Sequence, residues 1–224
     1  MSLDHRPVVA AQRREKMRAR LIEAAVLVVA KKGLDGTVID DVAVHAGVSR
    51  GTFYNHFPSV PDLMIAALQE LSNEIGLAVH SATMGIQYPD QRLATAFAIF
   101  LATARAYPVF GQFMSGMGHQ GWCKGDVVAQ LLPRHLADGV ATGDFCELPF
   151  DLAYDMLSAT IGASLQRERK GEAVDQIALV ALLLRGLGVP RARAQDLAAI
   201  NAEPLIADPE SLVARSHAIW EQSA

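Results

Sequence analysis

The chain has 224 residues, of which 51% are hydrophobic and 20% are charged. This apolar fraction suffices for a packed core and argues against a disordered chain. Ala and Leu dominate and runs of β-branched residues are scarce, which predicts an all-α fold. No segment supplies the roughly 20 consecutive apolar residues of a membrane span. The first twenty residues include several charges and no apolar stretch typical of a signal peptide.

The net charge of −4 is distributed unevenly. Residues 1–57 contain 9 Lys and Arg against 6 Asp and Glu (+3), whereas residues 58–224 contain 11 against 18 (−7). A basic head on an acidic body is expected when only one end of a protein meets phosphate. The two cysteines, Cys123 and Cys146, have neither CxxC nor metal-ligand spacing. We therefore expect no metal site, and thiols kept in a reduced cytoplasmic compartment.

In chain order, we expect the first ten residues to form a loose arm and residues 13–32 to form a long amphipathic helix. Its buried side is marked by apolar residues at helical spacing: Leu21, Ala24, Ala25, Val28 and Val29. Lys31 and Lys32 complement the carboxyl end of the helix dipole. Gly33 then allows the left-handed conformation that ends many helices.

Three further helix starts are marked by capping residues. Thr37, with Asp40 three residues later, predicts the start of a helix over 37–46. Ser49 predicts the cap of a short helix that continues to about Phe57. Ser59-x-x-Asp62, with a proline tolerated in the first turn, predicts a fourth helix over 59–80.

From Asp90 onward, longer apolar stretches are broken by Gly and Pro. We expect helices near 90–106, 108–117, 125–140, 149–169, 173–187, 190–200 and 209–222. Repeats and low-complexity segments are absent. The expected division is a three-helix DNA-binding domain over residues 1–57 and a larger helical effector-binding and dimerisation domain over residues 58–224.

Residues 37–57 have the pattern of a helix-turn-helix. Apolar positions that two short helices would share as a small core are Val42, Ala46, Val48, Phe53 and Phe57. Gly47 permits the sharp turn between the helices. The outer side of the second helix is rich in hydrogen-bond donors: Ser49, Arg50, Gly51, Thr52, Tyr54, Asn55 and His56. Such residues can reach phosphate oxygens and base edges in a major groove.

This segment resembles the TetR family of bacterial transcriptional regulators over about residues 13–65. The matching residues are Lys32-Gly33, Thr37, Asp41-Val42-Ala43, Ala46-Gly47-Val48-Ser49, Gly51-Thr52-Phe53-Tyr54, His56-Phe57, Ser59 and Asp62-Leu63. The resemblance implies a cytoplasmic homodimer that binds double-stranded DNA and a small-molecule effector. It further implies recognition helices in successive major grooves of a near-palindromic operator, with half-sites about 34–36 Å apart.

Carried over by position, the resemblance makes Arg50, Gly51, Thr52 and Asn55 contacts at or near base edges, beside Ser49. Tyr54, His56 and Thr37 would contact phosphates, Thr37 at its helix N-terminus. Two positions depart from the family pattern. Val60 stands where a lysine is usual, and Val38 where a hydroxyl residue often occurs. Each loss predicts weaker non-specific binding and a salt slope shallower by roughly 0.9 per lost phosphate contact. The cluster Arg13, Arg14, Lys16, Arg18 and Arg20 could compensate.

A dimer interface is expected in the helices near 149–169 and 173–187. The second is apolar nearly all round, so its own domain can bury one side and a partner subunit the other. The candidate interface residues are Ala159, Gly162, Ala163, Ile177, Val180, Ala181 and Leu184. These helices resemble the pair that forms the family's dimeric four-helix bundle. The alternative is that both helices are simply core of one subunit.

The region 90–122 has many aromatic and flexible side chains, and the resemblance implies that it helps to line an effector cavity. The candidate lining residues are Phe97, Phe100, Phe110, Phe113, Met114, Met117, Trp122 and, further on, Tyr154. Met and Phe favour a small apolar or aromatic effector whose binding releases a repressor from DNA. Ordinary core packing is the alternative for many of these residues.

Two other functions stay open. The chain lacks the common nucleotide-binding, protease and hydrolase motifs, so no catalytic residue or cofactor is predicted and an enzyme is disfavoured. The departures at Val38 and Val60 allow a ligand-binding helical module whose DNA-binding head has degenerated.

Overall fold

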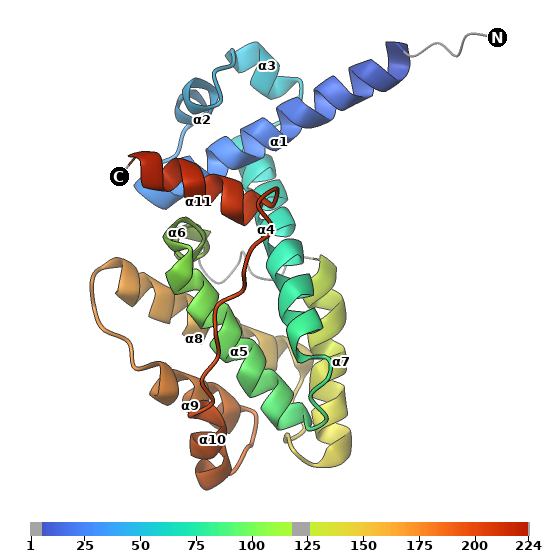
Figure 1. The fold of residues 1–224 in the computed structure, drawn as a ribbon, viewed down its shortest axis with the longest axis vertical. Coiled ribbons are helices and arrows are strands. Elements are labelled where there is room, and N and C mark those ends of the chain that lie inside the picture. The colour runs from blue at the N-terminus through green and yellow to red at the C-terminus, as the bar shows by residue number, and fades with distance from the viewer. Residues whose placement is uncertain (1–5, 118–125, 224) are drawn as a thin grey trace, which may run out of the picture.

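The computed structural model describes residues 6–117 and 126–223, in which all regular structure is helical (Figure 1). The helices are α1 (Arg6–Lys32), α2 (Ile39–His45), α3 (Arg50–Tyr54), α4 (Val60–Thr83), α5 (Pro89–Ala106), α6 (Pro108–Met117), α7 (Asp126–Thr142), α8 (Phe150–Arg169), α9 (Gln176–Gly186), α10 (Arg191–Ala198) and α11 (Leu212–Ser223). This confirms the predicted all-α fold and the order of its elements.

Helix α1 is longer than predicted, because it begins at Arg6 rather than near residue 13. The loose arm expected over the first ten residues is therefore wrong for residues 6–10, which are helical. Nothing in that stretch breaks a helix: Pro7 lies in the first turn, where proline is tolerated, and Ala10 and Ala11 are strong helix formers. In Figure 1 the beginning of α1 projects away from the rest of the molecule, with α2 and α3 packed beside its middle.

Helix α2 begins at Ile39, two residues later than predicted, so the cap assigned to Thr37 and Asp40 is wrong. The Thr37 hydroxyl donates instead to the carbonyl of Gly33, at 2.7 Å, and the side chain is buried. Val38 is the N-cap residue, and its N–H donates to the carboxylate of Asp41, at 3.4 Å. The capping carboxylate is thus shifted by one residue from the predicted one.

The caps predicted at Ser49 and Ser59 are confirmed. The Ser49 hydroxyl accepts from the N–H of Thr52 at 3.1 Å, and that of Ser59 accepts from the N–H of Asp62 at 3.3 Å. Each side chain satisfies one of the backbone donors that a helix start leaves unpaired. The start of the recognition helix is therefore fixed by a local interaction.

The body consists of α4 to α10, with α4 running from the head down beside α7 (Figure 1). One continuous core connects it with the head: α1 packs on α4 and α6, and α6 packs on α8. Within the described ranges, no single helix is both long and apolar enough to cross a membrane. Only α5 and α6 taken together pass such a test, and they bend by 110° at their junction.

The C-terminal segment returns to the head, which no sequence pattern predicts. Residues 199–211 run along α5 as an extended strap (Figure 1), held by hydrogen bonds from Leu205 N to Thr103 Oγ1 (2.9 Å) and from Ala207 N to Tyr107 Oη (3.0 Å). Helix α11 then packs on α1, α4 and α6. Arg215 of α11 binds Glu23 of α1, with Nε and Oε2 2.9 Å apart.

Candidate DNA interface and buried cavity

The turn between α2 and α3 depends on Gly47, whose φ of 62° lies in the left-handed region. The N–H of Gly47 donates to the carbonyl of Val44 at 3.0 Å, and that of Val48 donates to the carbonyl of Ala43 at 2.9 Å. This pair of hydrogen bonds is the Schellman arrangement that ends many helices at a glycine. It directs the chain sharply into α3, as the helix-turn-helix pattern predicts.

Helix α3 separates its residues into a buried and an exposed side. Phe53 is fully buried, and Phe57, just beyond the helix, packs in the same core. The predicted DNA-contact residues on this helix and its caps all retain solvent exposure: Ser49, Arg50, Gly51, Thr52, Tyr54, Asn55 and His56. Tyr54 stands in solvent with its ring edge against Phe53, at a centroid distance of 5.6 Å. The exposed side therefore presents donors and a phenol in one row.

Arg50 is not free in this row, because its guanidinium binds the carboxylate of Asp40 through two nitrogens. Asp40 belongs to α2, and the turn brings it opposite the first residue of α3. Hydrogen bonding to Arg50 lowers the pKa of Asp40, and the same contact raises the pKa of Arg50. The sequence reasoning missed this pair, because it treated the face of α3 alone.

The remaining predicted DNA-contact residues differ in their availability. Thr37 is buried with its hydroxyl directed to Gly33, so only its surroundings reach solvent. Arg18, one of the basic cluster on α1, lies over the Phe57 ring at 5.4 Å and within 3.9 Å of Glu70. Arg13, Arg14 and Lys16 are exposed on the projecting part of α1. Arg20 is also exposed, so Arg18 is the member of the cluster that is partly covered.

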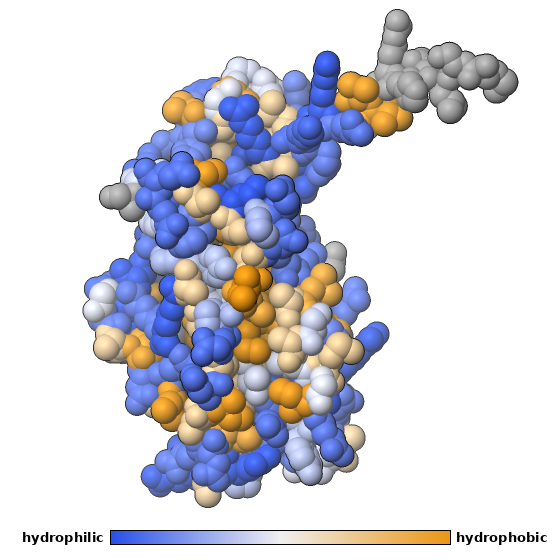
Figure 2. Space-filling model, viewed as in Figure 1, coloured by the Kyte–Doolittle hydropathy of each residue, from blue (hydrophilic) through white to orange (hydrophobic). Residues whose placement is uncertain are grey.

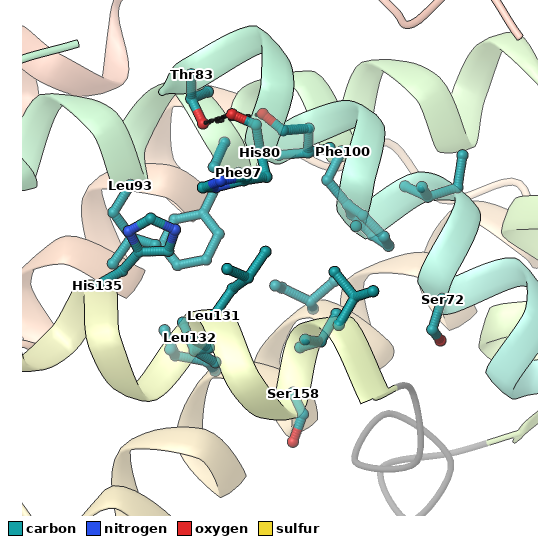
Figure 3. Close-up of a pocket in the computed structure, with 18 of the residues that line it drawn as sticks. Ser72, His80, Thr83, Leu93, Phe97, Phe100, Leu131, Leu132, His135 and Ser158 are labelled. Atoms are coloured by element: carbon teal, nitrogen blue, oxygen red, sulfur yellow. Dashed lines mark hydrogen bonds between the residues drawn. The ribbon is translucent and has the colours of Figure 1, made fainter. Parts of the chain in front are cut away.

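A cavity of about 170 Å³ lies in the body, between α4, α5, α6, α7 and α8 (Figure 3). Five of the predicted lining residues face it: Phe97, Phe100, Phe110, Met114 and Tyr154. Phe113 is fully buried elsewhere in the core and Met117 packs against that core, so neither lines the cavity. Trp122 lies outside the described residues.

Much of the cavity wall was not predicted, because it comes from α4 and α7. These helices contribute Ile75, Gly76, Val79, His80, Val128, Leu131, Leu132 and His135. Their apolar residues follow the ordinary amphipathic pattern, which does not distinguish a residue that packs in the core from one that lines a cavity. The two histidines were not predicted either, because their separation in the sequence gives no sign that they meet.

His80 and His135 meet at one end of the cavity, beside Phe97 and Leu93 (Figure 3). Their ring centroids are 5.5 Å apart, and the Nδ1 atoms of both are buried without a hydrogen-bond partner among the described residues. Burial lowers the pKa of His135, as do the positive charge of Arg92 and the ring of His80, against the opposing effect of Asp138. The surroundings of His135 therefore favour its neutral form.

The candidate dimer residues divide into two sets. Gly162, Val180, Ala181 and Leu184 are buried within their own subunit, because this side of α8 and α9 faces the core. Ala159, Ala163 and Ile177 are exposed. Two large apolar residues of α8 and α9 that the sequence reasoning missed are also exposed: Leu152 is 62% exposed and Leu182 is 55% exposed, similar to Ile177 at 54%. We call Leu152, Ala159, Ala163, Ile177 and Leu182 the α8–α9 patch.

The surface of the head differs from that of the body. On the face drawn in Figure 2, hydrophilic residues cover most of the head and its projecting helix, whereas apolar residues reach the surface at several places in the body. Exposed apolar side chains are thus more frequent on this face of the body than on the head.

Comparison with known proteins connects these features to one family. The family model for bacterial regulatory proteins of the tetR family matches residues 21–67. The HTH-type transcriptional repressor DhaR of Mycobacterium sp. (strain GP1) is 30% identical over 184 residues, which cover 75% of this chain and 91% of DhaR. The uncharacterized regulator YerO of Bacillus subtilis (strain 168) is 27% identical over 106 residues, 41% of this chain and 37% of YerO.

Among solved structures, the complex of RolR with its ligand resorcinol has a TM-score of 0.69 and 27% identity, over 86% of this chain and 97% of RolR. The RolR structure without ligand has a TM-score of 0.68 and 25% identity, over 83% of this chain and 98% of RolR. The similarity to both RolR and DhaR extends well beyond the helix-turn-helix, into the body that contains the cavity. The chain therefore belongs to the TetR family, as a transcriptional regulator with a DNA-binding helix-turn-helix.

Proposed function

We propose that this regulator is a dimeric repressor that binds a near-palindromic operator and is released by a small apolar or aromatic effector. In this proposal residues 1–57 bind DNA, and residues 58–224 bind the effector and the second subunit, in the cytoplasm. The observation that carries it is the exposed polar side of α3, from Ser49 to His56, on a head whose net charge is positive. The repressor role is also that of the relative DhaR.

The chemistry of α3 supports a major-groove contact. Arg50 can form a bidentate contact to guanine, and Thr52 and Asn55 are further side chains able to address base edges. Tyr54 and His56 are placed to bind phosphates, which fix the register of the helix on DNA. Val38 and Val60 retain solvent exposure, but neither side chain can donate a hydrogen bond to a phosphate. The proposal therefore keeps the expected loss of two phosphate contacts.

The cavity supports the effector part of the proposal through its connection to the head. Phe110 and Met114 line the cavity from α6, and α6 packs directly against α1. A ligand shifts a conformational equilibrium only as far as it binds one conformation more tightly than the other. A ligand that moves α6 would thus change the position of α1, and with it the spacing of the two α3 helices in a dimer. RolR, whose crystal structure contains resorcinol, is a relative with a bound aromatic ligand.

The DNA-binding part is tested by a mobility shift on the promoter region beside the chain's own gene. The wild-type protein should bind specifically and lose affinity as salt rises. Arg50→Ala should reduce operator affinity by about tenfold or more, since one bidentate base contact is lost. Arg191→Ala, at an exposed arginine on α10, is the matched control and should bind as the wild type does. Absence of specific binding to any neighbouring promoter would contradict the proposal and favour a degenerate head.

The dimer is proposed to form through the α8–α9 patch, since exposed large apolar residues at neighbouring positions typically mark an interface. Leu182→Glu places a charge in the middle of this patch and should yield monomers in sedimentation velocity. Leu77→Glu, at a position of similar exposure (53%) on α4, should leave the dimer intact. A wild-type protein that sediments as a monomer at micromolar concentration, or a Leu182→Glu variant that stays dimeric, would refute this interface.

A further inference from the structure

The volume of the cavity limits the size of its ligand. It measures about 170 Å³, and a dry engineered cavity of about 150 Å³ lined by Leu, Ile and Phe binds benzene. One aromatic ring with a small substituent therefore fills the available space. The ring would lie among Phe97, Phe110 and Leu131, which line the cavity.

The polar end of the cavity limits the chemistry of the substituent. His80 projects from α4 and His135 from α7 toward the same end (Figure 3), and both Nδ1 atoms lack a partner among the described residues. A neutral imidazole has one N–H donor and one bare acceptor nitrogen. A hydroxyl group both donates and accepts, and the two nitrogens that one hydroxyl oxygen joins lie about 4.5–5 Å apart. The ring centroids of His80 and His135 are 5.5 Å apart, so the two rings lie close enough for one small group to meet both.

A charged substituent fits this end less well. Burial and the charge of Arg92 disfavour the protonated form of His135, so this ring is less suited to pair with a carboxylate than an ordinary histidine is. The charge of Arg92 is itself engaged: Nε donates to the carbonyl of Ile86 at 3.0 Å, and Nη1 lies 3.5 Å from the Asp138 carboxylate. An anion here would lose its hydration without gaining an unpaired cation.

We propose that the effector is an uncharged, single-ring hydroxylated aromatic compound whose hydroxyl group bridges His80 and His135. This rests on the proposed function, in which the cavity is the effector site. The apolar wall holds the ring, and the histidine pair selects the hydroxyl.

Titration calorimetry on the purified full chain tests this with three probes of similar size: phenol, toluene and benzoate. Toluene replaces the hydroxyl by a methyl group of similar volume, and benzoate replaces it by a carboxylate. Phenol should bind at least about tenfold more tightly than either, because only phenol pairs both buried nitrogens. Equal or tighter binding of toluene or benzoate would overturn the proposal, as would no binding of phenol.

Two variants locate the selectivity. His80→Leu and His135→Leu should each remove the preference for phenol over toluene while leaving toluene affinity within a few-fold. Leu132→Ala, which removes an apolar part of the same wall, is the control and should weaken both ligands in similar proportion. Circular dichroism checks that each variant folds. If a leucine variant does not fold, His80→Gln and His135→Gln take its place, and the order of the three probes on the wild type decides in any case.

A mobility shift on the operator with and without phenol separates this inference from the proposed function. A chain that binds DNA but ranks the probes differently refutes only the ligand class. A chain that binds phenol selectively but no DNA refutes only the regulator. Release of the operator by phenol, but not by toluene at equal concentration, would support both.

Discussion

The exposed side of α3 and the cavity in the body both offer polar groups, but those of α3 are in solvent and those of the cavity are buried. On α3 the polar groups stand in solvent, and Arg50 is already paired with Asp40. In the cavity the walls are apolar, and the Nδ1 atoms of His80 and His135 are buried without a described partner. A partner of α3 must exchange existing contacts in water, whereas a ligand in the cavity can supply contacts that are missing.

This difference determines which forces govern each site. Binding at an exposed, charged surface depends on phosphate charge and therefore on salt. Binding in a closed apolar space depends on volume, on burial and on every hydrogen bond being made. We therefore expect changes on α3 to act on DNA affinity with little effect on stability, and changes beneath it or in the body to act on stability first.

The largest expected effect contrasts two neighbouring residues of α3. Phe53→Ala removes a fully buried ring from the head and should lower the free energy of unfolding by about 3–5 kcal/mol. Tyr54→Ala, at an exposed position, should cost about 1 kcal/mol or less but weaken operator binding. Urea unfolding and a mobility shift measure the two effects. A Tyr54→Ala variant as unstable as Phe53→Ala would contradict the assignment of Phe53 to stability and Tyr54 to DNA binding.

The head was predictable because its determinants are close in sequence. Gly47, Ser49 and Phe53 lie within seven residues, and each acts through local geometry: a left-handed turn, a cap and a buried contact. The errors were also local. The start of α2 was placed at Thr37, because a hydroxyl residue followed by Asp40 has the form of a cap. The hydroxyl instead donates to Gly33, a competing use that the pattern does not reveal.

The cavity was predictable only in part, because it is assembled from distant segments. His80 and His135 are 55 positions apart, and nothing in either helix indicates that they meet. The apolar richness near residue 100 did identify Phe97, Phe100, Phe110 and Met114, since aromatic residues concentrate there. Phe113 belongs to the same aromatic-rich stretch, but it is fully buried in the core and does not line the cavity. Whether a side chain faces the core or an empty space depends on the packing of all five helices.

A smaller effect is expected at the turn that positions α3. Gly47→Ala forces a side chain into a φ of 62°, which should lower the free energy of unfolding by about 1–2 kcal/mol. Its Cβ would also lie 2.7 Å from a guanidinium nitrogen of Arg20, which must move. Gly51→Ala is the matched control. Its Cβ would meet only the Ser49 hydroxyl, at 3.7 Å, and alanine favours the helix. Thermal unfolding should separate the two variants, and equal stability would contradict the role assigned to Gly47.

The Asp40–Arg50 pair gives a prediction on DNA binding alone. Asp40→Asn removes a negative charge beside α3 and frees the guanidinium, so binding to non-specific DNA should tighten by about tenfold and its salt slope should steepen by roughly 0.9. Operator binding should tighten less, because an Arg50 held in one orientation loses less freedom at a base edge. Asp35→Asn makes the same charge change at an exposed position without a contact to Arg50. If Asp40→Asn and Asp35→Asn change the ratio of specific to non-specific affinity equally, the Asp40–Arg50 pair affects DNA binding only through the charge of Asp40.

The smallest expected effect is the pH dependence of stability from His135. Its pKa is below the ordinary value of 6.5 in the folded protein, because of burial, Arg92 and His80, with Asp138 opposing them. Between these two values the unfolded chain binds more protons than the folded one, so stability rises with pH. The contribution is complete above about pH 6.5 and is lost as pH falls through the lowered pKa. Urea unfolding between about pH 5 and 7 measures the free energy of unfolding against pH. In His135→Gln this pH dependence should be flatter. Leu132→Ala should lower the free energy of unfolding by the same amount at each pH. The affinity for phenol should fall as the pH falls through the same window, because the proposed hydrogen bond needs a neutral His135. An affinity for phenol that rises on acidification would contradict this pairing.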